Sequence, residues 1–287
     1  MELIPAVAKA LEELRRQRPL IHHITNFVTM TDCANATLAI GASPTMTNAV
    51  EEVAEMAAAA RALVLNLGTL QAWTLEAMLA AGKSAAAHGV PIVFDPVGAG
   101  GTIFRTQAAL RLLDELPMAV IRGNASEITC LAAHKSGQDF GVDSRLGPAD
   151  PALASSLASH LGTTVAITGA VDVLSDGCQT AEIRNGCPML TYVTGTGCMT
   201  TSLIASFAAV ADPFTAAAGG ILAMGIGGEL ALAGEGKNGP GTFHARLFDA
   251  FYQLNDAILQ NEEAGGVQQA GCRQRGSGKA AQRSGGH

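Results

Sequence analysis

The sequence has few charged side chains and no excess of basic ones. Of its 287 residues only 15% are charged and 48% are hydrophobic. This is far from the composition of disordered proteins, and the chain is long enough to bury a large core. Four basic residues lie at or after position 273, which leaves 14 basic against 25 acidic residues before it. A surface of that charge repels nucleic acid and anionic lipid, so we expect neither as a partner.

The cysteines lack the spacings that are typical of zinc sites and disulfide frameworks. The six of them include no CxxC pair: Cys33, Cys130, Cys178, Cys187, Cys198 and Cys272. We therefore expect reduced thiols. A secretory signal is also missing, since the first nineteen residues place apolar side chains at helical spacing among charged ones. These features predict a cytoplasmic protein.

Uninterrupted apolar runs long enough to span a membrane are absent too. The most apolar stretch, residues 199–234, is broken at Asp212 and Pro213, and Glu229 lies in its second half. Neither piece reaches the roughly 20 apolar residues that a membrane span requires. We expect two buried helices packed in a soluble core. The GxGxxG motif of a Rossmann-type dehydrogenase is also missing after the first strand, which argues against that class of enzyme.

Short runs rich in β-branched residues alternate with blocks rich in Ala and Leu. The runs predict strands over 63–67, 91–94, 119–121, 164–167 and 190–193. The blocks between them predict helices over 71–87, 105–115 and 151–161. Strands that alternate with helices form a parallel sheet covered on both faces.

The pattern changes in the last part of the chain. Helical blocks drop out between residues 164 and 193, which predicts an antiparallel meander at one edge of the sheet. Three consecutive helices are then expected over 198–211, 213–233 and 241–261. No linker divides the chain, so we expect a single domain over residues 1–264. Residues 265–287 offer almost nothing apolar to bury and predict a flexible tail.

The sharpest local signal is Val-Thr-Gly-Thr-Gly-Cys at residues 193–198. A strand there passes through Gly195 and Gly197 into an apolar helix, so free N–H groups and the positive end of the helix dipole meet at one point. Such a point attracts an anion. Cys198 lies in the first helical turn, where we expect its pKa to fall and the thiolate to act as a base. The alternative is an ordinary tight turn with a buried cysteine.

Three further strand ends carry polar side chains. Asp95 ends a buried strand before a Gly-rich loop, Arg122 ends the next one, and Thr168 follows another. In open α/β sheets ligands gather at this edge. Asp95 and Glu127 could hold Mg²⁺ there, with Arg122 and Thr168 at phosphate oxygens. The simpler alternative for Glu127 is a helix cap shared with Asn124.

Two passages near the N-terminus mix amide and apolar side chains. Residues 24–28 and 43–46 read as strands that run into loops, and such a wall suits a small, mostly apolar ligand.

In combination these segments resemble the hydroxyethylthiazole kinase family of the ribokinase-like superfamily. ITNFVTM, SPTMTNAVEE, VFDPVGAG, IRGNASEI, AITG and VTGTGCM follow one another over residues 20–200, and the resemblance extends over about residues 1–262. It implies a three-layer α/β/α ribokinase-like fold, with a mostly parallel central sheet and an antiparallel edge. It also implies that ATP, with Mg²⁺, phosphorylates the hydroxyl of 4-methyl-5-(2-hydroxyethyl)thiazole in thiamine salvage.

The resemblance assigns roles to individual residues. At the thiazole it places Asn26, Val28, Met46 and Gly195, and at ATP it places Arg122 and Thr168, to which we add Thr196 and Gly197 of the glycine turn. Asp95 and Glu127 fall in the metal and phosphate network, and Cys198, which we count as catalytic together with Asp95, takes the position of the general base.

The family resemblance further implies a homotrimer whose pockets are completed by the neighbouring subunit. The alternatives are a kinase of hydroxymethylpyrimidine or pyridoxal, and a nucleotide-binding protein without turnover.

Overall fold

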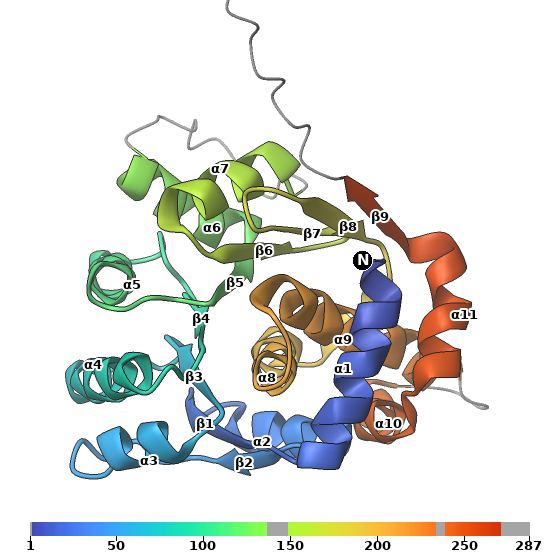
Figure 1. Cartoon of the computed structure of the whole chain (residues 1–287), viewed down its shortest axis with the longest axis horizontal. Helices are drawn as coiled ribbons and strands as arrows, with labels where there is room; N and C mark the ends of the chain where they lie inside the picture. The colour runs from blue at the N-terminus through green and yellow to red at the C-terminus, as the bar shows by residue number, and fades with distance from the viewer. Residues whose placement is uncertain (1, 137–148, 234–238, 271–287) are drawn as a thin grey trace, which may run out of the picture.

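The computed structural model describes residues 2–136, 149–233 and 239–270. Its strands form one sheet between two layers of helices (Figure 1). The strands are β1 (Leu20–Ile24), β2 (Ser43–Thr45), β3 (Ala62–Asn66), β4 (Ile92–Asp95), β5 (Val120–Asn124), β6 (Thr164–Thr168), β7 (Asp172–Ser175), β8 (Thr180–Ile183) and β9 (Val267–Ala270). Their order is β2-β1-β3-β4-β5-β6-β7-β8-β9. The strands from β2 to β6 pair in parallel, and β7, β8 and β9 are antiparallel. The predicted mostly parallel sheet with an antiparallel edge is confirmed.

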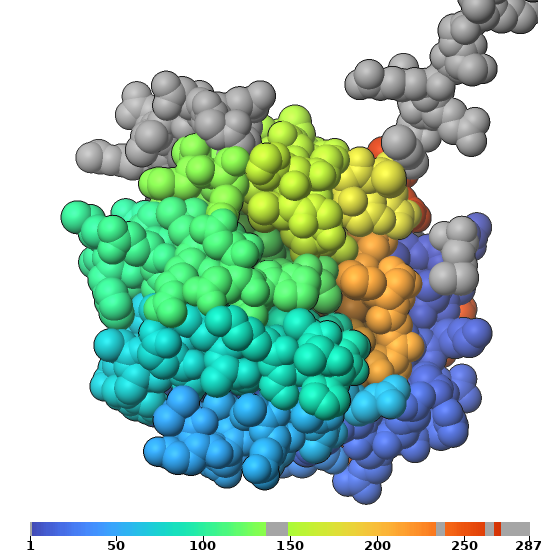
Figure 2. Space-filling view, turned by 60° about the vertical axis from the view of Figure 1, so that its left-hand side comes forward, coloured from blue at the N-terminus to red at the C-terminus, as the bar shows by residue number. Residues whose placement is uncertain are grey.

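One layer of helices covers the face of the sheet that carries the site. It consists of α1 (Leu3–Gln17), α2 (Met30–Ile40), α8 (Thr196–Ala208), α9 (Pro213–Ala233), α10 (Pro240–Gln253) and α11 (Asp256–Gly266). The opposite layer consists of α3 (Val53–Ala59), α4 (Ala72–Ala87), α5 (Ile103–Glu115), α6 (Ala125–Ser136) and α7 (Pro151–Leu161). From outside, much of that opposite layer follows chain order from blue to green (Figure 2). The three-layer α/β/α prediction is confirmed.

Side chains along each central strand alternate between the two cores. In β3, Val64 packs in the core beneath α8 and α9, whereas Leu63 and Leu65 pack in the core beneath α4 and α5. β4 repeats the pattern, with Val93 in the first core and Phe94 in the second. This period of two fixes which face each strand's last residue points to.

Helix α9 is apolar on all sides. By length and composition it could cross a membrane, but most of it is buried within the fold. It packs against α8 and α1 in the same core. The expectation of two buried helices over residues 199–234 is confirmed, as far as Ala233.

The prediction of a strand over 190–193 is wrong. Residues Pro188–Tyr192 form a short 3-10 helix, η1, instead. Pro188 has no N–H to give to a strand ladder, and its carbonyl accepts a hydrogen bond from Thr191 Oγ1 at 2.8 Å. The meander is formed by β6, β7 and β8 without this segment.

Two further differences lie near the C-terminus. The single helix expected over 241–261 is two helices, because the chain leaves the helical conformation at Leu254 and Asn255 caps α11 by accepting from Ile258 N–H at 3.0 Å. Residues Val267–Ala270, expected to belong to a flexible tail, pair with β8 as β9. The rest of that predicted tail, 271–287, lies outside the described residues.

Candidate active site

Four polar side chains form a row along the carboxyl ends of neighbouring strands. Each stands two residues after an apolar residue of the core beneath α8, so each points toward α8: Asn66, Asp95, Arg122 and Thr168. Asn66 and Asp95 are direct neighbours in the parallel register of β3 and β4. The sheet alone therefore assembles an amide, a carboxylate, a guanidinium and a hydroxyl in one line.

The N-terminus of α8 faces this row. Gly195 precedes the helix with a φ of 86°, and the first helical hydrogen bond runs from Met199 N–H to Gly195 O at 2.8 Å. The N–H groups of Thr196, Gly197 and Cys198 consequently have no partner within the helix, which makes this turn an anion site.

Gly195 is required by its backbone conformation and its surroundings, and Gly197 lies close to the end of the Arg122 side chain. A Cβ at Gly195 would collide with Thr29 Cγ2, and the positive φ disfavours any other residue there. A Cβ at Gly197 would stand 2.6 Å from Arg122 Nη1. The amide turn and the guanidinium are thus in contact, as an anion shared between them requires.

The Cys198 thiol accepts two amide N–H groups. Asn26 Nδ2 lies 3.2 Å and Asn66 Nδ2 3.3 Å from Sγ. Burial, and next the Asp95 carboxylate, raise the pKa of the Cys198 thiol above its ordinary value. The prediction of a lowered pKa is therefore wrong, because the loss of water around the sulfur disfavours the thiolate. At neutral pH the thiol is mostly protonated.

Asp95 is fully buried at the centre of the row. Its Oδ2 accepts hydrogen bonds from Asn66 Nδ2 and Thr201 Oγ1, both at 2.8 Å, and lies 3.6 Å from Arg122 Nη1. Burial raises the pKa of Asp95 to about 6, while Arg122 counteracts it. The carboxylate is mostly ionised at neutral pH. Its other oxygen, Oδ1, is buried without a hydrogen-bond partner.

Glu127 ties two loops of the site together. Its Oε1 accepts from Gly98 N–H at 2.8 Å and its Oε2 from Asn124 N–H at 2.9 Å. Asn124 Oδ1 in turn accepts from Glu127 N–H at 2.9 Å. The helix cap that the sequence offers as the simpler alternative for Glu127 is thus present. The same carboxylate also fixes the glycine-rich loop that follows Asp95.

A metal ion at this edge would have few protein ligands. Among the described residues no group of three or more His, Cys, Asp or Glu side chains could hold an ion. Mg²⁺ usually takes one or two carboxylates together with substrate phosphates and water. The unpartnered Oδ1 of Asp95 meets that requirement, so the residues present fit Mg²⁺ carried by a phosphate ligand.

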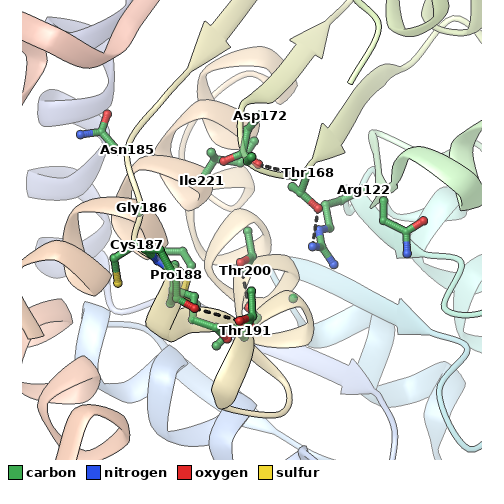
Figure 3. Close-up of a pocket in the computed structure, with 18 residues that line it drawn as sticks. Arg122, Thr168, Asp172, Asn185, Gly186, Cys187, Pro188, Thr191, Thr200 and Ile221 are labelled. Carbon is green, nitrogen blue, oxygen red and sulfur yellow. Dashed lines mark hydrogen bonds between the residues drawn. The ribbon is translucent and has the colours of Figure 1, made fainter. Parts of the chain in front are cut away.

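Beside the row lies a cavity of about 640 Å³ (Figure 3). It is lined by all four residues that were predicted at ATP: Arg122, Thr168, Thr196 and Gly197. The Arg122 guanidinium donates to Thr168 Oγ1. On the far side, α9 and the segment around η1 contribute an apolar wall made of Pro188, Leu190, Ile221 and Met224.

The residues predicted at the thiazole lie apart from this cavity. Asn26 is buried, and its Oδ1 accepts from Val28 N–H at 3.1 Å and Thr29 N–H at 3.0 Å, so it shapes its own loop as well as contacting Cys198. Met46 is half-buried against the core beneath α8. Val28 is 65% exposed and does not line this cavity.

Sequence analysis missed three residues that the geometry brings to the site. Asn66 bridges Asp95 and Cys198, and a signal for it existed, since it is a polar residue in an otherwise apolar strand. Thr201 donates to Asp95 from the second turn of α8, where nothing in the pattern distinguishes it. Asp172, which lines the cavity, begins a strand of the meander.

Known proteins resemble this chain over most of its length. A sequence model described as "Hydroxyethylthiazole kinase family" matches residues 11–257. A hydroxyethylthiazole kinase of Thermoanaerobacter pseudethanolicus is 48% identical over 255 residues, which are 88% of this chain and 96% of that protein.

Solved structures also resemble this chain. A hydroxyethylthiazole kinase protein from Pyrococcus horikoshii OT3 superposes with a TM-score of 0.82 at 40% identity, covering 92% of this chain and 98% of the other. A ribokinase-like superfamily protein from Enterococcus faecalis V583 has a TM-score of 0.59 at 14% identity, covering 87% and 95%, and shares the fold.

Proposed function

The chain belongs to the hydroxyethylthiazole kinase family, and from this premise we propose how its residues phosphorylate the hydroxyl of 4-methyl-5-(2-hydroxyethyl)thiazole with ATP in thiamine salvage. It is a phosphotransferase with an alcohol acceptor. One observation carries the proposal: the amides of Thr196, Gly197 and Cys198, which have no partner within the helix, lie at the start of α8 beside the Arg122 guanidinium. An anion held there is adjacent to the Cys198 thiol, to which Asn66 of the row and Asn26 both donate.

ATP binds in the cavity with its phosphates toward Arg122. The guanidinium and the Thr168 hydroxyl contact phosphate oxygens, and the amides of Thr196 and Gly197 receive the γ-phosphoryl group as negative charge develops on it. These groups are held in place before the reaction, since Asp95 and Thr168 fix the guanidinium. The protein thereby aligns and neutralises the triphosphate.

The thiazole alcohol lies on the other side of Cys198, against Asn26, Val28, Met46 and Gly195. Its hydroxyl approaches Sγ and loses its proton there as the oxygen attacks phosphorus. The amide N–H groups of Asn26 and Asn66 that already point at the sulfur stabilise the thiolate form, and the nearby Asp95 carboxylate opposes it. Cys198 is therefore a weak base whose orientation is fixed by two amides.

Mg²⁺ belongs to the same proposal. When bound, it neutralises the β- and γ-phosphates, with Asp95 and Glu127 as the residues that would hold it. Asp95 has the unpartnered oxygen, and Glu127 retains a second lone pair on each oxygen beyond its hydrogen bonds to N–H groups.

Replacing Glu127 with glutamine should raise the Mg²⁺ concentration needed for half-maximal rate. An amide removes the negative charge but keeps one oxygen for the helix cap. Asp150→Asn is the matched control, because Asp150 caps α7 by accepting from Ala152 N–H at 2.9 Å on the surface. Rates measured against Mg²⁺ concentration for both variants provide the comparison. Superimposable titrations for Glu127→Gln and wild type would leave Glu127 as a cap only.

We also propose a homotrimer with sites at subunit interfaces. Val28 is a proposed thiazole residue, yet 65% of it is exposed, and beside it Phe27 contacts Trp73 with ring centroids 6.4 Å apart. A neighbouring subunit that covers these side chains would close the thiazole pocket.

Light scattering should therefore give the mass of three chains. Val28→Glu should lower that mass and raise the KM for the thiazole alcohol more than the KM for ATP, because a charge would be buried at the interface. A wild-type protein that runs at the mass of one chain at assay concentration contradicts the trimer.

An assay of ADP release with a panel of alcohols tests the function itself. The thiazole alcohol should give the highest kcat/KM, above hydroxymethylpyrimidine and pyridoxal, which represent the alternative vitamin-precursor kinases. ADP release with none of the alcohols would identify a nucleotide-binding protein without turnover. The net negative charge supports the absence of nucleic-acid and membrane partners, and the cysteine spacings and the first nineteen residues support a cytoplasmic location.

A further inference from the structure

The cavity beside the active site has one positive and one negative side chain among its described lining residues. Arg122 stands at one point of its wall and Asp172 at another, and all other lining residues are neutral. Arg122 is in β5 and Asp172 begins β7, with β6 between these two strands. A turn of three residues joins Asp172 to Thr168 at the end of β6. Figure 3 shows Asp172 on the same side of the cavity as Thr168.

Only one of the two oxygens of the Asp172 carboxylate accepts a hydrogen bond from the described chain. Its Oδ1 accepts from Gly169 N–H at 2.9 Å, which fixes the turn between β6 and β7. Its Oδ2 accepts no hydrogen bond from the described chain, and the residue lines the cavity. An asparagine could fix the turn equally well, so the turn alone does not explain a charged group at this position.

The surroundings of Asp172 make the charge costly. Burial raises the pKa of Asp172 to about 6, although the Gly169 N–H and the Arg122 guanidinium both act to lower it. A carboxylate that has lost part of its water regains the lost interactions when a ligand donates a hydrogen bond to it. The cavity thus holds a strong acceptor for a neutral donor group.

Resting on the proposed function, we propose that Asp172 is a specificity residue for the nucleotide and accepts a hydrogen bond from a ribose hydroxyl of ATP. Phosphates are repelled by a carboxylate and have their own site at Arg122 and the start of α8. In ATP the ribose is joined directly to the phosphates. Asp172 is joined by one short turn to Thr168, which is the proposed phosphate contact, so we place the ribose beside Asp172. The base then reaches the apolar wall of Leu190, Ile221 and Met224.

The test compares ATP with 2′-deoxy-ATP and 3′-deoxy-ATP in wild type and in Asp172→Asn, at saturating thiazole alcohol. In wild type, removing the hydroxyl that Asp172 accepts should raise the nucleotide KM by about 10- to 100-fold, as expected for a lost hydrogen bond to a charged group, with kcat changed little. In Asp172→Asn the KM for ATP should rise. The KM for the deoxy-nucleotide that lacks this hydroxyl should then lie within about threefold of the KM for ATP.

Asp176→Asn is the matched control. Asp176 also lies in the β6–β8 meander and accepts backbone N–H groups, those of Cys178 and Gln179 at 2.8 Å, but it does not line the cavity. This variant should keep the wild-type ratio of the KM values. Thermal unfolding of both variants verifies that they are folded.

Equal KM values for ATP and both deoxy-nucleotides in wild type would overturn the proposal, and so would a wild-type ratio preserved in Asp172→Asn. The proposal is also overturned if Asp172→Asn shifts the Mg²⁺ concentration needed for half-maximal rate but keeps the wild-type ratio of KM values. That result would assign Asp172 to the metal. Calorimetric binding of ADP and the deoxy-ADPs requires no turnover. Discrimination there without any phosphorylation of the alcohol would show that the proposed function fails while the inference holds.

Discussion

Replacing Cys198 with alanine should lower kcat by about 10- to 10⁴-fold, the range expected for a lost general base, with a smaller change in KM. The loss arises because Sγ is the atom at the start of α8 to which Asn26 and Asn66 point their amides. Steady-state rates with both substrates measure it. Cys33→Ala is the control, because it removes a second, fully buried thiol near Thr29 and should leave kcat near the wild-type value. Unchanged turnover in Cys198→Ala would remove the thiol from the mechanism.

The pH dependence of the same reaction shows whether the thiol has to ionise. Its raised pKa means that the thiolate fraction in wild type grows with pH throughout the neutral range, so kcat should rise with pH. Cys198→Asp places a carboxylate there, whose ordinary pKa is about 4 and lies far below that of a thiol. That variant should retain or exceed wild-type activity and should lose the rise. A rise of equal steepness in both enzymes would place the titrating group elsewhere.

Replacing Arg122 with glutamine should lower kcat/KM for ATP by about 10²- to 10³-fold, the range for removal of a preorganised group at developing negative charge. The guanidinium donates to Thr168 and stands 3.6 Å from Asp95, and among the described residues that line the cavity no other side chain is basic. Arg122→Lys should lie between glutamine and wild type, because it keeps the charge and loses the planar fork.

The matched control for Arg122→Gln is Arg111→Gln. Arg111 lies on the surface of α5, where it pairs with Glu76 at 2.7 Å and Glu115 at 2.9 Å. Exposed pairs of this kind contribute little, so both the activity and the fold should persist in the control. An Arg122→Gln enzyme with kcat/KM close to that of the control would move the phosphate site away from Arg122.

Much of this arrangement follows from patterns that are visible in the chain. Buried β-branched runs with Gly and Pro between them predict the parallel strands, and the period of two along a strand then places Asp95, Arg122 and Thr168 on one face. Asn66 obeys the same rule. As the one polar residue of a buried apolar strand, it is itself a signal of a site.

The predictions that are wrong concern features that depend on contacts between distant parts of the chain. The helix position of Cys198 predicts a lowered pKa for its thiol, but burial raises that pKa. The segment after β8 resembles a strand, yet Glu229 of α9 accepts from Gly186 N–H at 2.7 Å and holds the chain away from the sheet. β9 exists only because β8 offers it a free edge.

The polar row and the proposed thiazole wall belong to different kinds of structure. The row stands on four central strands, whereas Val28 and Met46 lie in connections after β1 and β2, at the border of the sheet. Exchanging those two connections would leave the strands of the polar row intact. On the proposed function, a change of acceptor alcohol would require new loops at the sheet border and no new phosphate site.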